Sequence, residues 1–209
     1  MIYIFDELDK LRADFPDKFK ELLSNERYSK YHRLHSSLCK KASAAVYLLL
    51  RIALNEVYGI NEVVEFDYNE KGKPSLVKYP NIHFSLSHSH NIAACVVSDN
   101  PIGLDAQKIC PVSDKVAKRV LTKDEYSTYI NSREPNDYFC KIWAIKESYI
   151  KKMGDGITFV FDDISAEEII DKNVFKEKDY YCCVCGSATN EMRINHIGGK
   201  HFEQLCNGL

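Results

Sequence analysis

The sequence predicts an α+β protein in which a long helix followed by strands occurs twice, near residues 38–97 and again near residues 138–185. In the first of these segments, apolar residues recur at helical spacing from Leu38 to Val57, and Gly59 follows as a left-handed cap. Short apolar runs with the spacing of strands follow each helix. The chain therefore contains two similar α+β segments.

The composition is that of a globular protein. Its 209 residues are 45% hydrophobic and 28% charged, which allows a substantial core. A formal net charge of −2 gives no global positive field, so we expect no nucleic-acid partner. The apolar run Ala44–Leu50 is too short to span a bilayer, and residues 1–6 do not resemble a signal peptide. We expect a cytoplasmic protein without a membrane partner.

Eight cysteines are present, and without a secretion signal they are expected to be reduced core residues rather than disulfides. Residues 157–161 and 180–185 predict strands, with a turn and a short helix between them. Cys183 and Cys185 alternate on the second of these strands. The spacing of the cysteines and of nearby histidines fits no usual zinc site, so structural zinc is not expected.

Residues 1–35 are polar and irregularly patterned. Within them, residues 27–33 combine basic and aromatic side chains, which is typical either of a solvated helix face or of a contact for a polyanionic ligand. Residues 60–68 then predict a strand, and residues 69–74 predict a turn that holds Lys73 between a glycine and a proline. This turn is either a plain hairpin loop or a support for a fixed cation.

Residues 82–90 predict a half-buried strand that ends in hydroxyl and imidazole groups. Ser87 and His88 at this end could bind phosphate oxygens, or they could simply form a polar strand end. In the strand predicted at residues 102–107, Asp105 and Gln107 project from one face. Such a pair suits a hard cation such as Mg²⁺, which binds one or two carboxylates together with phosphate oxygens and water.

Residues 113–121 predict a helix with three exposed basic side chains, which is either a solvated face or a surface for docking a protein. A capping box at residues 122–125 starts another helix. A loop is expected at residues 131–137. A further helix then carries Trp143, Glu147 and Lys151 on one face.

The Glu147–Lys151 pair has two interpretations. An exposed pair in this order stabilises a helix by about 0.3–0.5 kcal/mol. The alternative is one side of a metal-bound phosphate site, for which other parts of the chain supply the remaining groups.

Four motifs in order resemble those of the 4′-phosphopantetheinyl transferases. The resemblance is to the monomeric type that activates peptide synthetases, and it extends more weakly over residues 25–160. The motifs are Gly72-Lys73-Pro74, Phe84-Ser85-Leu86-Ser87-His88-Ser89, Ile102-Gly103-Leu104-Asp105, and the W-x-x-K-E-S-x-x-K pattern of residues 143–151.

The resemblance implies a fold of two pseudo-twofold-related halves, each a helix packed on an antiparallel sheet, here residues 1–100 and 101–209. It implies transfer of the phosphopantetheine arm of coenzyme A to a serine of an apo acyl or peptidyl carrier protein. The cofactor would be Mg²⁺, which Mn²⁺ could replace, and 3′,5′-ADP would be released. Such carriers serve fatty acid, polyketide or nonribosomal peptide synthesis.

The resemblance also implies roles for individual residues. Metal ligands would be Asp105 and Glu147, with Gln107 beside them. Glu147 would be the general base, assisted by Lys151 and His88. Coenzyme A would be bound by a set of mostly basic residues: Lys30, Lys41, Lys73, Ser87, His88 and Lys151.

Two positions depart from the family pattern. Gln107 stands where many members carry a second acidic residue, and Ala42 stands where a relative would carry an arginine for the nucleotide 3′-phosphate. Lys40 or Lys41 could serve in its place.

Two other functions fit the same residues. One is a Mg²⁺-dependent phosphoesterase that uses Asp105 and Glu147 to activate water. The other is a non-catalytic coenzyme A or nucleotide-binding module, which would be favoured if Gln107 leaves the cation unbound.

Overall fold

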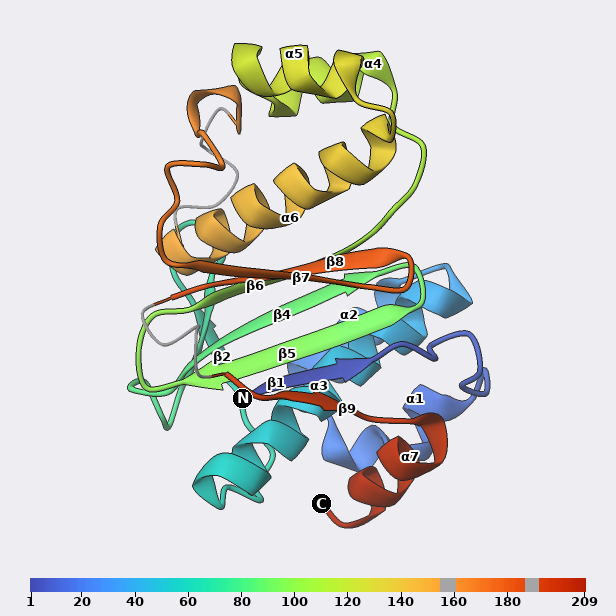
Figure 1. Cartoon of the computed structure of the whole chain (residues 1–209). Helices are drawn as coiled ribbons and strands as arrows, with labels where there is room; N and C mark the ends of the chain where they lie inside the picture. The colour runs from blue at the N-terminus through green and yellow to red at the C-terminus, as the bar shows by residue number, and fades with distance from the viewer. Residues whose placement is uncertain (155–160, 187–191) are drawn as a thin grey trace.

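The computed structural model describes residues 1–154, 161–186 and 192–209 and arranges them in layers (Figure 1). Two sheets pack face to face at the centre. Helix α3 (Ser37–Tyr58) covers the outer face of one sheet, and helix α6 (Pro135–Met153) covers the outer face of the other. The expected fold class, α+β with a helix on the sheet of each half, is confirmed.

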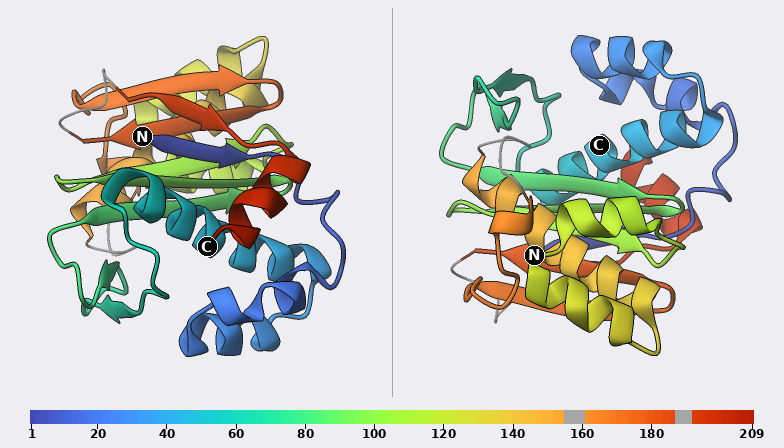
Figure 2. Two further views of the ribbon diagram at one scale, coloured as in Figure 1. Left: turned by 90° about the horizontal axis from the view of Figure 1, so that it is seen from below. Right: turned by 90° about the horizontal axis from the view of Figure 1, so that it is seen from above.

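The first sheet has the strand order β4-β5-β1-β9. Its antiparallel strands are β1 (Ile2–Phe5), β4 (His83–Ser89) and β5 (Ile92–Ser98), while β9 (Ile194–His196) pairs with β1 in parallel. Beside it, β2 (Phe66–Tyr68) and β3 (Pro74–Leu76) form a separate hairpin. Seen from below, α3 runs across this sheet and the hairpin projects at one end (Figure 2).

The second sheet has the order β6-β8-β7 and is antiparallel throughout. Its strands are β6 (Gly103–Lys108), β7 (Lys172–Glu177) and β8 (Tyr180–Cys185). The remaining helices are short: α1 (Phe15–Lys18), α2 (Asn25–Arg33), α4 (Asp114–Val120), α5 (Lys123–Asn131) and α7 (Gly199–Asn207). Among the described residues, no helix combines the length and the apolar character that a membrane crossing requires.

Side chains alternate across both sheets, which places three apolar clusters between the layers. On β8, Cys183 and Cys185 face α6, while Cys182 and Val184 face the other sheet. On β1, Ile2 and Ile4 lie between the sheets, and the intervening side chains face α3. Both sheets are therefore buried on both faces, and the clustered cysteines of β8 belong to the core.

The strands β4 and β6 meet through serine side chains rather than through a backbone ladder. Ser85 Oγ accepts a hydrogen bond from the backbone N–H of Leu104 at 2.9 Å, and Ser87 Oγ accepts one from Ala106 at 3.1 Å. Ser89 Oγ accepts a third from the N–H of Lys108, at 3.2 Å. We call these three contacts the serine seam. They satisfy backbone donors of β6 that its partner β8 does not use.

Several local expectations are confirmed. Helix α3 ends at Tyr58 and Gly59 caps it with a φ of 68°. The capping box joins Thr122 and Glu125 at the start of α5. The expected helix at residues 113–121 is α4.

Other expectations were wrong. No strand was expected in the first 35 residues, but Ile2–Phe5 form a buried strand inside the first sheet. Asn25–Arg33 form α2, which agrees with the helix considered for residues 27–33. The loop expected at 131–137 is shorter, since α6 begins at Pro135, a residue suited to the first turn of a helix. Of the strand expected at 60–68, only Phe66–Tyr68 forms.

The carboxyl-terminal part also differs from expectation. In the region expected to hold a strand at 157–161, residues 157–160 lie outside the described residues, and Phe161–Asp163 form a 3-10 helix. Strand β7 was not anticipated. At the end of the chain, β9 pairs with β1, and α7 packs in the same apolar cluster as α3.

Helix α6 approaches β6 so closely that only glycine fits at position 103. A Cβ built on Gly103 would overlap the backbone oxygen of Ser148 and the backbone nitrogen of Lys152. Since both are backbone atoms, neither can rotate away. The short distance between α6 and β6 therefore requires glycine at position 103.

Gly103→Ala should lower the free energy of unfolding by at least about 3 kcal/mol, the upper end of the usual cost of overpacking. Urea denaturation monitored by circular dichroism measures this change. Gly198→Ala is the matched control, because a Cβ there meets nothing within 4 Å. Equal stability of the two variants would contradict the close contact of β6 and α6.

Candidate functional site

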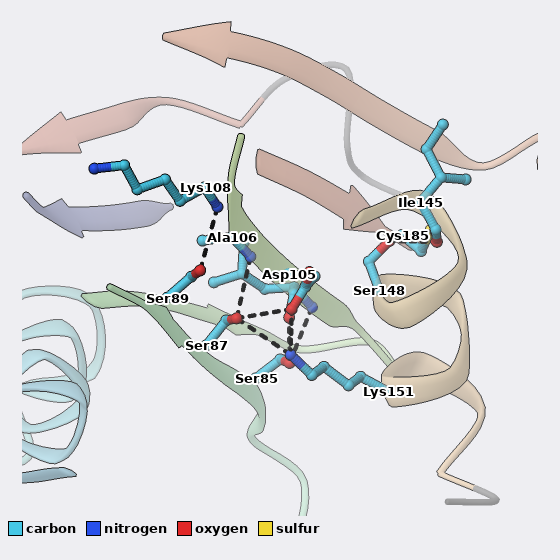
Figure 3. A network of polar contacts seen from close by, with 11 residues as sticks. Ser85, Ser87, Ser89, Asp105, Ala106, Lys108, Ile145, Ser148, Lys151 and Cys185 are labelled. Atoms are coloured by element: carbon cyan, nitrogen blue, oxygen red, sulfur yellow. Dashed lines mark hydrogen bonds and ion pairs between the residues drawn. The ribbon is translucent and has the colours of Figure 1, made fainter. Parts of the chain in front are cut away.

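Three elements bring the predicted catalytic groups together. Asp105 projects from β6 toward α6, Ser87 comes from β4, and Lys151 comes from the last turns of α6 (Figure 3). Asp105 Oδ1 accepts hydrogen bonds from Ser87 Oγ at 2.8 Å and from Lys151 Nζ at 2.7 Å. Lys151 Nζ also lies 3.2 Å from Ser87 Oγ. The two halves of the chain thus meet at one carboxylate.

The second oxygen of Asp105 is not satisfied in this way. Asp105 is only 5% exposed, and its Oδ2 is buried with no hydrogen-bond partner among the described residues. A buried carboxylate oxygen without a partner costs free energy, because water no longer solvates it. Such an atom is suited to accept a cation.

Glu147 supplies a second carboxylate beside Asp105. It lies one helical turn before Lys151 and is half-buried. Burial raises the pKa of Glu147, the negative charge of Asp105 raises it further, and Lys151 partly opposes both effects. Two carboxylates therefore share one ammonium, and the excess negative charge favours a divalent cation.

Two cavities adjoin these groups. One, of about 280 Å³, is lined by Lys73, Glu147 and Lys151 among others. The second, of about 340 Å³, is lined by basic and aromatic side chains that include Arg27, Lys30 and His88. Both cavities are also lined by Gly72, Pro74 and Leu86, so they adjoin at the turn that precedes β3.

The second cavity is positively charged, and Arg27 is the part of it that sequence reasoning missed. Arg27 is 6% exposed, and its Nη2 donates to the backbone oxygen of Ser43 at 2.8 Å. Its Nε is buried with no hydrogen-bond partner among the described residues. The signal was present in the sequence, since Arg27 and Lys30 lie three positions apart and share a helix face.

Burial and neighbouring positive charges lower the pKa values of Lys30 and His88. Removal from water lowers the pKa of Lys30, and the charge of Arg27 lowers it further. Burial lowers the pKa of His88, and the positive charges of Lys151, Lys30 and Arg27 lower it further. A concentration of like charge of this kind is relieved by a bound polyanion.

The other predicted residues lie at various distances from this centre. Lys73 Nζ donates to the backbone oxygen of Lys152 at 2.6 Å, so the lysine lies against the end of α6. Ser87 lines neither cavity and instead contacts Asp105. Lys41 is half-buried on α3 and also lines neither cavity.

The alternatives to Lys41 are also placed. Lys40 Nζ lies 5.1 Å above the ring of Tyr31. Ala42, where a relative would carry an arginine, is 2% exposed and packs in the core. The basic side chains that line the 340 Å³ cavity therefore come from α2 and β4 rather than from α3.

Gln107 lies on the same face of β6 as Asp105 and is half-buried. Its Nε2 donates to the backbone oxygen of Lys108 at 3.0 Å. Across residues 1–154, 161–186 and 192–209, no group of three or more His, Cys, Asp and Glu side chains is arranged to hold a metal. The two acidic side chains at this site would need ligands from Gln107, from water or from a substrate.

Three other residues of the W-x-x-K-E-S pattern face the protein interior. Trp143 stacks on Phe161 with ring centroids 5.4 Å apart. Ser148 Oγ donates to the backbone oxygen of Ile145 at 2.8 Å and lies 3.1 Å from Cys185 Sγ on β8 (Figure 3). These contacts fix the orientation of α6 around Glu147.

Lys146 is fully buried and joins α6 to its surroundings. Its Nζ donates to Glu125 Oε2 at 2.5 Å, to the backbone oxygen of Val120 at 2.7 Å and to that of Phe161 at 3.0 Å. Glu125 in turn accepts hydrogen bonds from the backbone N–H groups of Thr122 and Ala166. Burial lowers the pKa of Lys146, and the Glu125 carboxylate opposes this shift.

Lys146→Met should lower the free energy of unfolding by about 3–5 kcal/mol, because it leaves Glu125 buried without its counter-ion. Chemical denaturation measures the loss. The double variant Lys146→Met/Glu125→Gln should recover part of it, since no buried charge then remains. A loss that is the same in both variants would argue against a paired interaction.

Comparison with known proteins agrees with this geometry. The profile of the 4′-phosphopantetheinyl transferase superfamily matches residues 101–190, which include Asp105, Glu147 and Lys151. The chain is 31% identical to the 4′-phosphopantetheinyl transferase ffp of Bacillus subtilis over 185 residues. The aligned region covers 87% of this chain and 83% of that protein.

Two further relatives give the same result. The chain is 33% identical to the 4′-phosphopantetheinyl transferase gsp of Aneurinibacillus migulanus, over 77% of this chain and 74% of that protein. It is 32% identical to the 4′-phosphopantetheinyl transferase Sfp of Bacillus subtilis strain 168, over 71% of this chain and 68% of that protein. These similarities, extending over most of the chain and including the two carboxylates at the centre of the site, show that it belongs to the 4′-phosphopantetheinyl transferase superfamily.

Proposed function

We propose that this enzyme transfers the 4′-phosphopantetheine group of coenzyme A to a serine of an apo acyl or peptidyl carrier protein. The reaction is Mg²⁺-dependent and releases 3′,5′-ADP. The observation that carries the proposal is that Lys151, which contacts Asp105, lines a cavity together with Glu147, and that this cavity adjoins a basic one.

Coenzyme A is long and carries negative charge at its diphosphate and its 3′-phosphate. The two adjoining cavities provide cations for both. Lys73 and Lys151, which line the 280 Å³ cavity, would bind the diphosphate, while Arg27 and Lys30 would bind the 3′-phosphate of the nucleotide. His88, with its lowered pKa, would donate a hydrogen bond from a neutral ring.

The residues present fit a divalent cation. The unpartnered Oδ2 of Asp105 and the carboxylate of Glu147 would hold it, and the amide oxygen of Gln107 could add a neutral ligand. When bound, the ion would neutralise charge on the diphosphate and lower the pKa of the attacking hydroxyl. The neutral ligand should weaken metal affinity relative to a third carboxylate.

Glu147 accepts the serine proton in this scheme. The serine Oγ forms a bond to the phosphorus next to the pantetheine arm, and the bond from that phosphorus to the bridging oxygen of 3′,5′-ADP breaks. Glu147 would take this proton as the carboxylate that lines the cavity beside Lys151. Lys151 offsets the charge that builds on the diphosphate.

The proposal also includes the docking surface for the carrier protein, the oligomeric state and the cellular compartment. A carrier would dock beside α4, where Val116 is 42% exposed among Lys115, Lys118 and Arg119. Lys118 is paired with Asp114 at 2.7 Å, which leaves a surface of mixed charge around the exposed valine. We expect the enzyme to act as a monomer in the cytoplasm.

Mass spectrometry of an apo carrier incubated with this protein, coenzyme A and Mg²⁺ should detect the addition of one phosphopantetheine. Asp105→Asn and Glu147→Gln should each lower the rate by at least about 100-fold, because each removes charge from the metal site. The exposed Asp163→Asn is the matched control. A phosphoesterase would release phosphate or nucleotide without a carrier, and a binding module would leave the carrier unchanged; either result would reject the proposal.

Glu147 also makes stability depend on pH. Because its pKa is raised in the folded protein, its ionised form costs stability at neutral pH, and this cost disappears below the pKa of the unfolded chain. Glu147→Gln should therefore melt at a higher temperature than the parent protein at about pH 7.5 without metal, with the difference vanishing near about pH 4.

Addition of Mg²⁺ should raise the melting temperature of the parent protein but not that of Glu147→Gln, since only the former keeps both carboxylates. Exposed Glu168→Gln provides the control for the chemical change itself. If Glu147→Gln melts below the parent protein at about pH 7.5 without metal, Glu147 does not lie in an environment that disfavours its ionised form.

A further inference from the structure

The loop between β2 and β3, residues 69–73, is organised by one side chain. Asn69 Oδ1 accepts hydrogen bonds from the backbone N–H of Lys71 at 3.0 Å and of Lys73 at 2.8 Å. The backbone of Asn69 also accepts from Gly72, whose φ of 84° lies in the left-handed region. The conformation of the loop that presents Lys73 therefore depends on the amide oxygen of Asn69.

The same amide attaches the loop to the end of α6. Asn69 Nδ2 donates to the backbone oxygen of Gly154 at 3.0 Å, and Lys73 Nζ donates to that of Lys152 at 2.6 Å. A Cβ on Gly154 would lie 2.7 Å from Lys73 Cδ, so loop and helix are in van der Waals contact. These bonds satisfy carbonyl groups at the helix end that have no intrahelical donor.

The attachment lies beside the proposed phosphate site. Lys71 and Lys73, from the loop, line the 280 Å³ cavity together with Glu147 and Lys151, from the helix. Asn69 is not among the residues that line it. The distance between the lysines on the two sides of this cavity is therefore set partly by a residue outside it.

We propose that Asn69 is a positioning residue for coenzyme A, which acts by holding Lys73 at a fixed place relative to Lys151. The inference rests on the proposed function, since it assumes that the phosphates of coenzyme A occupy this cavity. Asn69 touches no substrate, and its effect passes through the lysine. Loss of the attachment leaves the loop to be ordered by the ligand, which lowers affinity rather than the rate of the bound complex.

Two variants separate the parts of this role. Asn69→Asp keeps the oxygen that accepts from the loop but loses the donor to Gly154, while Asn69→Ala loses both without adding charge. Each variant should raise the KM and the dissociation constant for coenzyme A by about 3- to 10-fold, which is the loss of affinity expected when one ordinary hydrogen bond is removed. The kcat should change little. Calorimetry and carrier labelling measure the two quantities.

Asn131→Asp is the matched control. Its Nδ2 donates to the backbone oxygen of Ser127 at 2.8 Å near the end of α5, so the change removes the same kind of bond and adds charge near a helix carboxyl terminus away from both cavities. It should leave the affinity for coenzyme A unchanged. Purely structural damage would lower the melting temperature of Asn69→Ala without raising either constant.

A double-mutant cycle with Lys73→Ala decides the matter. If Asn69 acts through Lys73, Asn69→Ala should weaken binding by less than about 1.5-fold in the Lys73→Ala background. The same factor in both backgrounds, or an unchanged dissociation constant in the parent background, would overturn the inference. A parent protein that binds coenzyme A but never labels a carrier would instead reject the proposed function.

Discussion

The site depends on the way two sheet edges are joined. Strand β6 uses alternate N–H groups to pair with β8, and the others face β4, whose serines accept them. The spacing of two residues on both strands fixes their register, so that Ser87 must lie beside Asp105. Unpaired, these buried N–H groups would each cost free energy. The bonds that join the two halves therefore also place the central carboxylate.

Two adjacent residues of α6, Lys146 and Glu147, differ in their surroundings: Lys146 is buried among its acceptors, and Glu147 lines a cavity. Lys146 has three acceptors and no exposure, and it holds the helix against α5 and the segment after residue 160. Glu147, one position later and about 100° around the helix, has a raised pKa and a shortage of positive charge. Because Lys146 fixes the helix, the backbone of Glu147 stays near Asp105, and the negative charge of Asp105 adds to burial in raising the pKa of Glu147.

The residue pattern predicted α3, which is long, and the capping box, which has a distinctive local signal. It failed for Ile2–Phe5, since a four-residue strand buried on both faces shows no alternation. Of the residues in the four motifs, Ser87, Asp105 and Lys151 are in contact with one another. The buried roles of Arg27 and Lys146 were missed because sequence patterns assign charged residues to the surface, and only coordinates reveal their acceptors.

The cavity between the halves is bounded by two independent joints. On one side lies the serine seam, and on the other the loop at residues 69–73 is attached to the end of α6. Lys73 belongs to the first half and Lys151 to the second, so neither half alone could set their separation. With both joints in place, Lys73 is held against the end of α6 and Lys151 is held against Asp105 before any ligand binds. The contacts that hold the two halves together therefore also determine the separation of Lys73 and Lys151.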